Sequence, residues 1–441
     1  MLKTLRDALK IKDIRKKIMY TFIMLVIFRI GCILPVPGVN SDVVKEIFSN
    51  LFGSTQGGVA NFFDAITGGS YTEMSIFALN ISPYITSSII MQLLTIAIPK
   101  LEEMQKDGEE GRKKIAEISR YVTIGLAIIQ SGATAIGFGS QGALENYSFF
   151  SVLVVILAMT AGSAFVMWIG EQITEKGIGN GISMVLLINI LSSIPNDFIT
   201  MYNRFVKGQN IVIGILGAIA CLVVIIALIV YVIILQDAER RIPVQYAQKV
   251  QGRRQVGGQS THIPLKVNTA GVIPVIFAGS LMSLPVVVSQ FTSVSADSIW
   301  GQIMMILNQR YWCNFQYPIY SVGLILYIAL IVVFAYFYTS ITFSPVEVAE
   351  NIKKQGGFVP GIRPGKPTVE YLTKILNYIV LIGAVGLVIV AVIPIVIAGV
   401  FSVNISFLGT SIIIVVGVVI ETIKQVESQM SVRHYKGFLD D

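Results

Sequence analysis

The longest stretch of this chain without a charged residue covers positions 375–420, which is 46 residues. A membrane-spanning helix needs about 20 apolar residues, so we expect two crossings here, joined near residues 394–404. Residues 211–235 also contain no Asp, Glu, Lys or Arg. Hydrophobic residues make up 54% of the chain and charged residues only 13%. A soluble globule cannot hide so much apolar surface, so the sequence predicts a polytopic membrane protein and excludes an ordinary soluble enzyme or a disulfide scaffold.

Ten stretches are long and apolar enough to be expected as membrane-spanning helices. Their length separates them from buried strands, and their continuous apolar character separates them from the alternating strands of outer-membrane barrels. The sequence therefore predicts an all-α fold with ten spans. The expected ranges are 18–37, 74–98, 119–138, 149–170, 182–200, 211–235, 269–289, 319–342, 371–395 and 405–424.

The basic residues predict the orientation of these spans. With the N-terminus in the cytosol, 28 of the 33 Lys and Arg residues fall in cytosolic segments and four in external segments, while Arg29 lies within the first span. Lysine and arginine are retained on the cytosolic side of membrane proteins, so this bias predicts that both termini are cytosolic. Seven of the basic residues precede residue 18, where we expect a cytosolic amphipathic segment that leads into a retained first span.

Two expected cytosolic loops, 236–266 and 343–370, are rich in Gly, Pro and Arg and lack a long apolar face. One interpretation is that their charge only fixes the topology. The other is that they dock a partner, because guanidinium groups on turn-rich loops bind acidic or nucleic-acid surfaces through planar pairs of donors. Their length favours docking, since far fewer residues would set the topology.

The first external loop, 38–73, contains a short apolar piece with Phe62, Phe63, Ala65 and Ile66. Such a piece could lie on the bilayer surface or fold back into the protein. A re-entrant segment is tolerated only where protein buries it or where it lines a cavity, so 59–70 is a candidate re-entrant element. The glycine-rich segment 177–181 lacks the spacing of a dinucleotide site and predicts a flexible turn.

No residue pattern in the sequence predicts catalysis. Only two histidines are present, and there is no HExxH sequence, no Cys/His cluster with metal-ligand spacing, no phosphate-binding loop and no GxSxG elbow. We therefore expect no catalytic residues, no metal and no cofactor. Arg29 is the clearest ionisable residue in a span, and snorkelling or an ion pair between helices is its simplest role. Few ionisable groups fall near the middle of the spans, which argues against an ion-coupled transporter.

Six motifs resemble the SecY family, the pore subunits of the general protein-export translocon. They occur in the family's order, and the resemblance covers essentially the whole chain. The motifs are FALNISPYITSSIIMQLLT (77–95), GIGNGIS (177–183), DAERRIPVQYAQK (237–249), KVNTAGVIPVIFA (266–278), FVPGIRPG (358–365) and GTSIIIVVGVVIE (409–421).

The resemblance implies an hourglass made of two five-helix halves with inverted topology, here 1–205 and 206–441. It implies that a ring of aliphatic side chains forms the waist, and that the segment 59–70 is a plug, with Phe62, Phe63 and Ile66 packing below the ring in the closed state. The implied ring residues are Ile81, Ile85, Leu186, Ile190, Ile276 and Ile414.

The resemblance also implies a lateral gate between spans two and seven, where Ser87, Gln92 and Asn268 are expected to line the seam. In the cytosolic loops, Arg240, Arg241 and Arg363 match positions that the family uses to dock the SecA motor or the ribosome. The implied partners are the small subunits SecE and SecG, the SecA ATPase, the ribosome, signal sequences, secretory polypeptides and membrane lipid. The implied location is the bacterial cytoplasmic membrane.

Together these observations predict a passive protein-conducting channel that is not an enzyme. The main alternative is a secondary solute transporter with inverted repeats, and a membrane-embedded enzyme comes third. One segment, 310–320, is richer in aromatic residues than the family pattern predicts, and its Cys313 has no evident mate. An interfacial aromatic belt is the only role that the sequence indicates for it.

Overall fold

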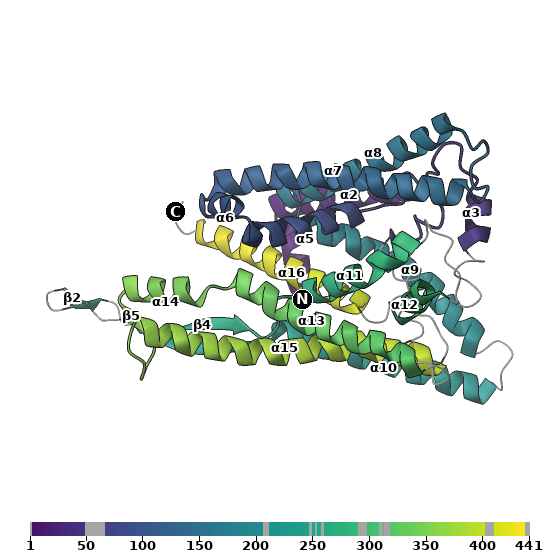
Figure 1. Cartoon of the computed structure of the whole chain (residues 1–441). Coiled ribbons are helices and arrows are strands. Elements are labelled where there is room, and N and C mark those ends of the chain that lie inside the picture. The colour runs from purple at the N-terminus through teal and green to yellow at the C-terminus, as the bar shows by residue number, and fades with distance from the viewer. Residues whose placement is uncertain are drawn as a thin grey trace.

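The computed structural model describes residues 2–48, 67–205, 211–246, 249–251, 254–256, 260–289, 298–307, 312, 318–401 and 410–436. The expected plug residues Phe62, Phe63, Ala65 and Ile66 lie outside these ranges. The molecule is mostly helical (Figure 1).

The first part of the chain forms eight labelled helices. They are α1 (Leu2–Lys10), α2 (Lys12–Ile33), α3 (Ser41–Phe48), α5 (Ser82–Ala97), α6 (Pro99–Lys106), α7 (Glu109–Gly139), α8 (Phe149–Lys176) and α9 (Gly181–Phe205).

The second part adds seven α-helices and a short 3-10 turn, η3 (Pro318–Ser321). Each of the ten ranges expected as spans overlaps a helix: α2, α5, α7, α8, α9, α10, α11, α13, α15 or α16. The helices of the second part are α10 (Ile211–Asp237), α11 (Ile273–Ser289), α12 (Ile299–Leu307), α13 (Val322–Thr342), α14 (Pro345–Lys354), α15 (Lys366–Phe401) and α16 (Thr410–Lys436).

By length and composition, four helical stretches of the described residues could cross a membrane: Glu109–Gly139, Phe149–Lys176, Ile319–Lys354 and Lys366–Val396. The pair α5 and α6, bent by 106° at Ile98, would be a fifth. Shorter apolar stretches lie in α9, α10 and α11. The chain is therefore a multi-pass membrane protein.

Three prolines of the expected spans lie in the first turn of a helix or inside one. Pro83 and Pro274 occupy the first turns of α5 and α11, where a proline costs no hydrogen bond. The second expected span consequently forms a helix only from Ser82 onward, and residues 67–81 are mainly turns. Pro394 lies inside α15, which continues past it to Phe401, within the range 394–404 expected for the junction.

The two large loops contain strands, so the fold is not wholly helical. Strand β1 (Glu239–Tyr246) pairs antiparallel with β4 (Ser260–Lys266) and with β5 (Gly357–Phe358), which belongs to the second loop. A small hairpin, β2 (Lys249–Gln251) and β3 (Arg254–Val256), extends from the tip. The alternating pattern of Ile242 and Val244 accounts for β1, because both point into a shared core with α14 and α15 while Pro243 between them is exposed.

The helices are arranged in two groups. In Figure 1, α2, α7 and α8 lie on one side and α10, α13 and α15 on the other, with α11 and α16 between them. Each group has an apolar core of its own: one contains side chains between Val36 and Met159, the other side chains between Leu228 and Val416. A third core joins the groups, and it contains the residues that the sequence predicted for the waist.

Candidate functional site

All six residues predicted for the aliphatic ring lie in one hydrophobic cluster. Four helices supply them, because Ile81 and Ile85 belong to the start of α5, Leu186 and Ile190 to α9, Ile276 to α11, and Ile414 to α16. Four of the six are buried, and Ile85 and Ile276 pack against them partly buried. The cluster forms where the two groups of helices meet, so residues separated by more than 300 positions line one apolar junction.

Asn80 fixes the start of α5 and therefore the position of Ile81. It is fully buried and has a positive φ of 53°, a conformation that asparagine tolerates better than most residues. Its Oδ1 accepts a hydrogen bond from the amide of Ile81 at 2.8 Å, and its carbonyl accepts one from Ser163 Oγ of α8 at 3.2 Å. Its Nδ2 donates to the carbonyl of Thr67 at 3.4 Å. The first ring residue is thus held to α8 and to the external loop.

Polar groups border the cluster on the side of residues 67–70. Arg29 Nη1 donates to the carbonyl of Gly68 at 3.3 Å, and Ser192 Oγ donates to the same carbonyl at 3.4 Å. Arg29 thus bonds to a backbone carbonyl among the described residues, where the sequence indicated snorkelling or an ion pair. Asn189, next to Ile190 in sequence, is fully buried, and neither its Nδ2 nor its Oδ1 has a hydrogen-bond partner among the described residues.

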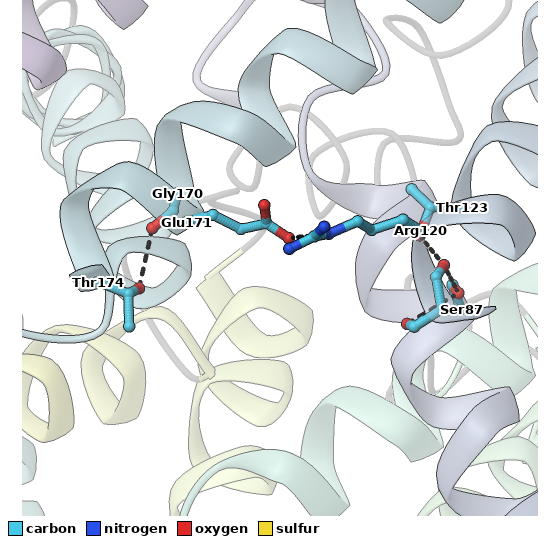
Figure 2. Close-up of polar contacts among 7 residues, drawn as sticks. Ser87, Arg120, Thr123, Gly170, Glu171 and Thr174 are labelled. Atoms are coloured by element: carbon cyan, nitrogen blue, oxygen red, sulfur yellow. Dashed lines mark hydrogen bonds and ion pairs between the residues drawn. The ribbon is translucent and has the colours of Figure 1, made fainter. Parts of the chain in front are cut away.

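The three predicted gate residues are not joined to one another. Ser87 is fully buried and donates to the carbonyl of Ser119 on α7 at 2.8 Å, so it faces α7 (Figure 2). Gln92 Oε1 and Asn268 Nδ2 are both buried, and neither has a hydrogen-bond partner in the part of the chain that the structure describes. The backbone of Asn268 lies beside Gly383 of α15. Gln92 and Asn268 can therefore accept or donate a further hydrogen bond, whereas the hydroxyl of Ser87 is already bonded to α7 in the same group of helices.

An ion pair joins α7 to α8 near Ser87. Arg120 Nε lies 2.8 Å from Glu171 Oε1, as Figure 2 shows. One turn further along α8, Thr174 Oγ1 donates to the carbonyl of Gly170 at 2.9 Å. The Arg120–Glu171 pair was not singled out from the sequence, because its two side chains come together only when α7 and α8 pack.

The predicted docking arginines lie on the three-stranded sheet and on the turn that follows it. Arg240 and Arg241 belong to β1, and Arg363 precedes α15; all three are exposed. Arg241 Nε lies 2.6 Å from Glu239 Oε1. Since β1 pairs with β5, both loops form one folded unit, although the sequence indicated turn-rich loops. The alternating apolar residues of β1 and β4 are typical of strands, so the sequence carried a signal for them.

Trp312, in the aromatic segment 310–320, does not lie in an aromatic belt at the membrane surface. Trp312 is only 1% exposed, its Nε1 donates to the carbonyl of Ile306 at 2.6 Å, and its ring centroid lies 5.2 Å from that of Tyr327. Trp312 therefore packs in the core of the second bundle, and the expectation of an interfacial belt is wrong for this residue. Cys313 lies outside the described residues.

Comparison with known proteins identifies the family. A protein-family model described as SecY matches residues 75–423 of the chain. A protein translocase subunit SecY of Halalkalibacterium halodurans is 42% identical over 453 positions, which cover 100% of both chains. The chain belongs to the SecY family. The family name and the translocase names of its members do not favour a solute transporter or an enzyme.

Solved SecY-like structures share the fold. A chain described as a protein-conducting channel has a TM-score of 0.60 at 18% identity, with 94% of this chain and 92% of that chain covered. A Sec61 chain from a canine ribosome–channel complex gives 0.59 at 18% identity with the same coverage. A SecY whose plug domain is described as maintaining a membrane seal gives 0.58 at 18% identity, again covering 94% and 92%.

Proposed function

We propose that this chain is a passive protein-conducting channel. It would pass unfolded polypeptides through the aliphatic cluster and release hydrophobic segments sideways into lipid. The observation that carries the proposal is the single cluster that unites six aliphatic side chains from four helices of two bundles. An aliphatic constriction can close by excluding water, and it can widen around cargo of varied size because it makes no directional contacts.

The topology that we propose has ten spans with both termini in the cytosol, arranged as inverted halves, 1–205 and 206–441. Ten helices overlap the expected ranges, and the bias of Lys and Arg supports the orientation. The membrane is the bacterial cytoplasmic membrane, as the family membership suggests. Polar chain segments would cross at the waist, where protein side chains replace lipid.

The segment 59–70 is proposed as the plug. Its described end, Thr67–Ser70, is held firmly: the carbonyl of Thr67 accepts from Ser70 Oγ at 2.6 Å, and that of Gly68 accepts from Arg29. This anchoring beside Ile190 supports a plug that packs against the ring. The similarity in fold to a SecY with a sealing plug domain supports the same proposal.

A lateral gate between α5 and α11 is proposed for the release of signal sequences into lipid. Gln92 and Asn268 support this role, because each keeps a buried polar atom that has no partner among the described residues, and a passing segment or water could satisfy it. Ser87 is the weakest of the three, since its hydroxyl already bonds to α7. A sufficiently hydrophobic segment would leave the gate because its transfer into lipid is favourable.

The energy for transport is proposed to come from partners that dock on the sheet formed by β1, β4 and β5. Arg240, Arg241 and Arg363 are exposed there and would bind acidic or phosphate groups. We propose the SecA ATPase and the ribosome as these partners and SecE and SecG as membrane subunits. The similarity to a Sec61 chain from a ribosome–channel complex supports the ribosome.

A pair of neighbouring residues on α9 tests the channel directly. Ile190 is 1% exposed within the cluster, whereas Leu191 is 41% exposed on another face of the same helix. Each would be replaced by Cys in a chain whose Cys32, Cys221 and Cys313 are replaced by Ala, and a secretory chain carrying one Cys would be stalled during export. Disulfides should form with Ile190→Cys at several positions of the stalled chain and not with Leu191→Cys. Equal cross-linking at both positions, or none at either, would overturn the proposal.

A further inference from the structure

Side chains from three helices hold the turn 177–181 between α8 and α9 in place, although the sequence predicted a flexible turn. Each of them accepts a hydrogen bond from a backbone amide of the turn. The bonds are Ile178 N to Thr21 Oγ1 at 3.0 Å, Gly179 N to Gln425 Oε1 at 2.7 Å, and Gly181 N to Thr174 Oγ1 at 2.9 Å.

The glycines of this turn are required by close approach and by conformation. A Cβ on Gly181 would overlap the carbonyl oxygen of Gly170 on α8. Gly179 has a φ of +85°, which other residues rarely adopt, and its amide points at Gln425 as a result. Asn180 Oδ1 accepts from the amide of Ile182 at 3.1 Å and so caps the start of α9. The backbone of the turn is therefore held at its position, and α9 begins from it.

The same turn ties α16 to the first bundle. Besides Gln425, α16 offers Gln429, whose Oε1 accepts from Lys17 Nζ of α2 at 3.3 Å. Between them, Val426 is buried in an apolar cluster with Ile14 and Ile178. On its other side, α16 contacts the second bundle, because Lys424 Nζ lies 2.6 Å from Asp237 Oδ1 of α10. The last helix of the chain thus bridges both groups at its cytosolic end.

The distances along the two helices match. Ile190 follows Gly181 by nine residues, which is roughly 14 Å at 1.5 Å per residue. Ile414 precedes Gln425 by eleven residues, or roughly 17 Å. The hydrogen bond between Gly179 and Gln425 therefore fixes how far α9 and α16 are shifted along each other. Ile190 and Ile414 lie at similar distances from this bond along their helices.

We propose that the turn 177–181 is a clasp between α9 and α16, and that Gln425 is a positioning residue that keeps Ile414 in the ring beside Leu186 and Ile190. The clasp keeps α16 with the first bundle when the waist widens, although α16 belongs to the second half in sequence. The waist then widens by movement of α11, because no hydrogen bond joins α11 to this turn among the described residues. The inference rests on the proposed channel function.

Replacing Gln425 tests the clasp. The variant Gln425→Leu removes the acceptor of the Gly179 amide, whereas Gln425→Glu keeps an oxygen at the same reach and serves as the rescue. Ser428→Leu, at an exposed position of the same helix, is the matched control. Loss of one neutral hydrogen bond changes an opening equilibrium by about three- to tenfold. We expect amide hydrogen exchange of residues 177–182 and the idle ion conductance of reconstituted vesicles to rise by that factor in Gln425→Leu only.

The two measurements separate the possible failures. Unchanged exchange in Gln425→Leu means that the clasp does not hold the turn and overturns the inference. Faster exchange with unchanged conductance also overturns it, because Gln425 would then stabilise the turn without positioning Ile414. If the starting protein exports no secretory chain with its motor, the proposed function fails, while the exchange result still decides whether the clasp exists. All variants should be extracted folded, with equal yield, before conductance is compared.

Discussion

Nζ of Lys424 lies 2.6 Å from Oδ1 of Asp237, and this ion pair joins α16 to the last residue of α10. The hydrogen bond and the charge of Lys424 hold the pKa of Asp237 below its usual value, with a smaller contribution from the charge of Lys266. A carboxyl whose pKa is lower in the folded state stabilises the fold above its unfolded pKa of about 4, and loses that contribution as the pH falls through the folded pKa.

The first prediction concerns this pair. Because both side chains are largely exposed, Lys424→Gln should destabilise the protein at pH 7 and low salt by no more than about 1 kcal/mol. The difference in thermal midpoint from the starting protein should shrink in about 1 M salt, where exposed charges are screened. Lys374→Gln, at an exposed lysine of α15, is the control. A loss in midpoint that salt leaves unchanged would mean that Lys424 acts through packing.

The second prediction concerns Trp312 in the second bundle. Trp312→Phe keeps an aromatic ring beside Tyr327 but leaves the carbonyl of Ile306 without its donor. A buried group that loses its partner costs about 1–3 kcal/mol, so the thermal midpoint in detergent should fall. Trp300, which is 42% exposed on α12, offers the same substitution as a control with little expected effect. Equal midpoints for the two variants would contradict the core position of Trp312.

The third prediction concerns the close approach of α8 to the segment before α5. A Cβ on Gly162 would overlap the carbonyl oxygen of Ile76, and this backbone atom cannot move aside as the end of a flexible side chain could. Gly162→Ala should therefore lower the yield of folded protein and loosen the start of α5, where Ile81 lies. Gly125→Ala on α7 meets open space and should be neutral or stabilising by up to about 1 kcal/mol, since alanine favours helices. Size-exclusion profiles and thermal midpoints of both variants check this.

The fourth prediction concerns docking on the sheet. Arg363→Glu reverses an exposed charge and should reduce partner-driven export in reconstituted vesicles several-fold, because an acidic or phosphate group would be repelled. Insertion of the variant into membranes should stay normal. Lys353→Glu on α14 reverses a charge elsewhere in the same loop and should have a smaller effect. If both variants reduce export equally, a general loss of positive charge explains the defect and the specific role of Arg363 is wrong.

Much of the fold was predictable from single segments of the sequence. The charge-free stretch 375–420 required two helices, and α15 and α16 occupy its two ends; residues 402–409 lie outside the described residues. The length of an apolar segment is a local property. The free energy of moving a segment into the membrane is the sum over its own residues and does not depend on the other segments. The strands β1 and β4 were not predicted, because the prolines and arginines of the loop outweighed the alternation of apolar residues in each strand.

Membership in the ring could be proposed only through the family resemblance, because a span that is apolar on every face carries no periodicity to say which face looks inward. Ile190 and Leu191 are both aliphatic neighbours, yet packing buries the first and exposes the second. Hydrophobicity along the chain determined which segments enter the membrane. Tertiary packing decided which of their faces meet, and it brought Gln425 to the amide of Gly179 across 246 positions, because a hydrogen bond needs two atoms in place and not merely two suitable residues.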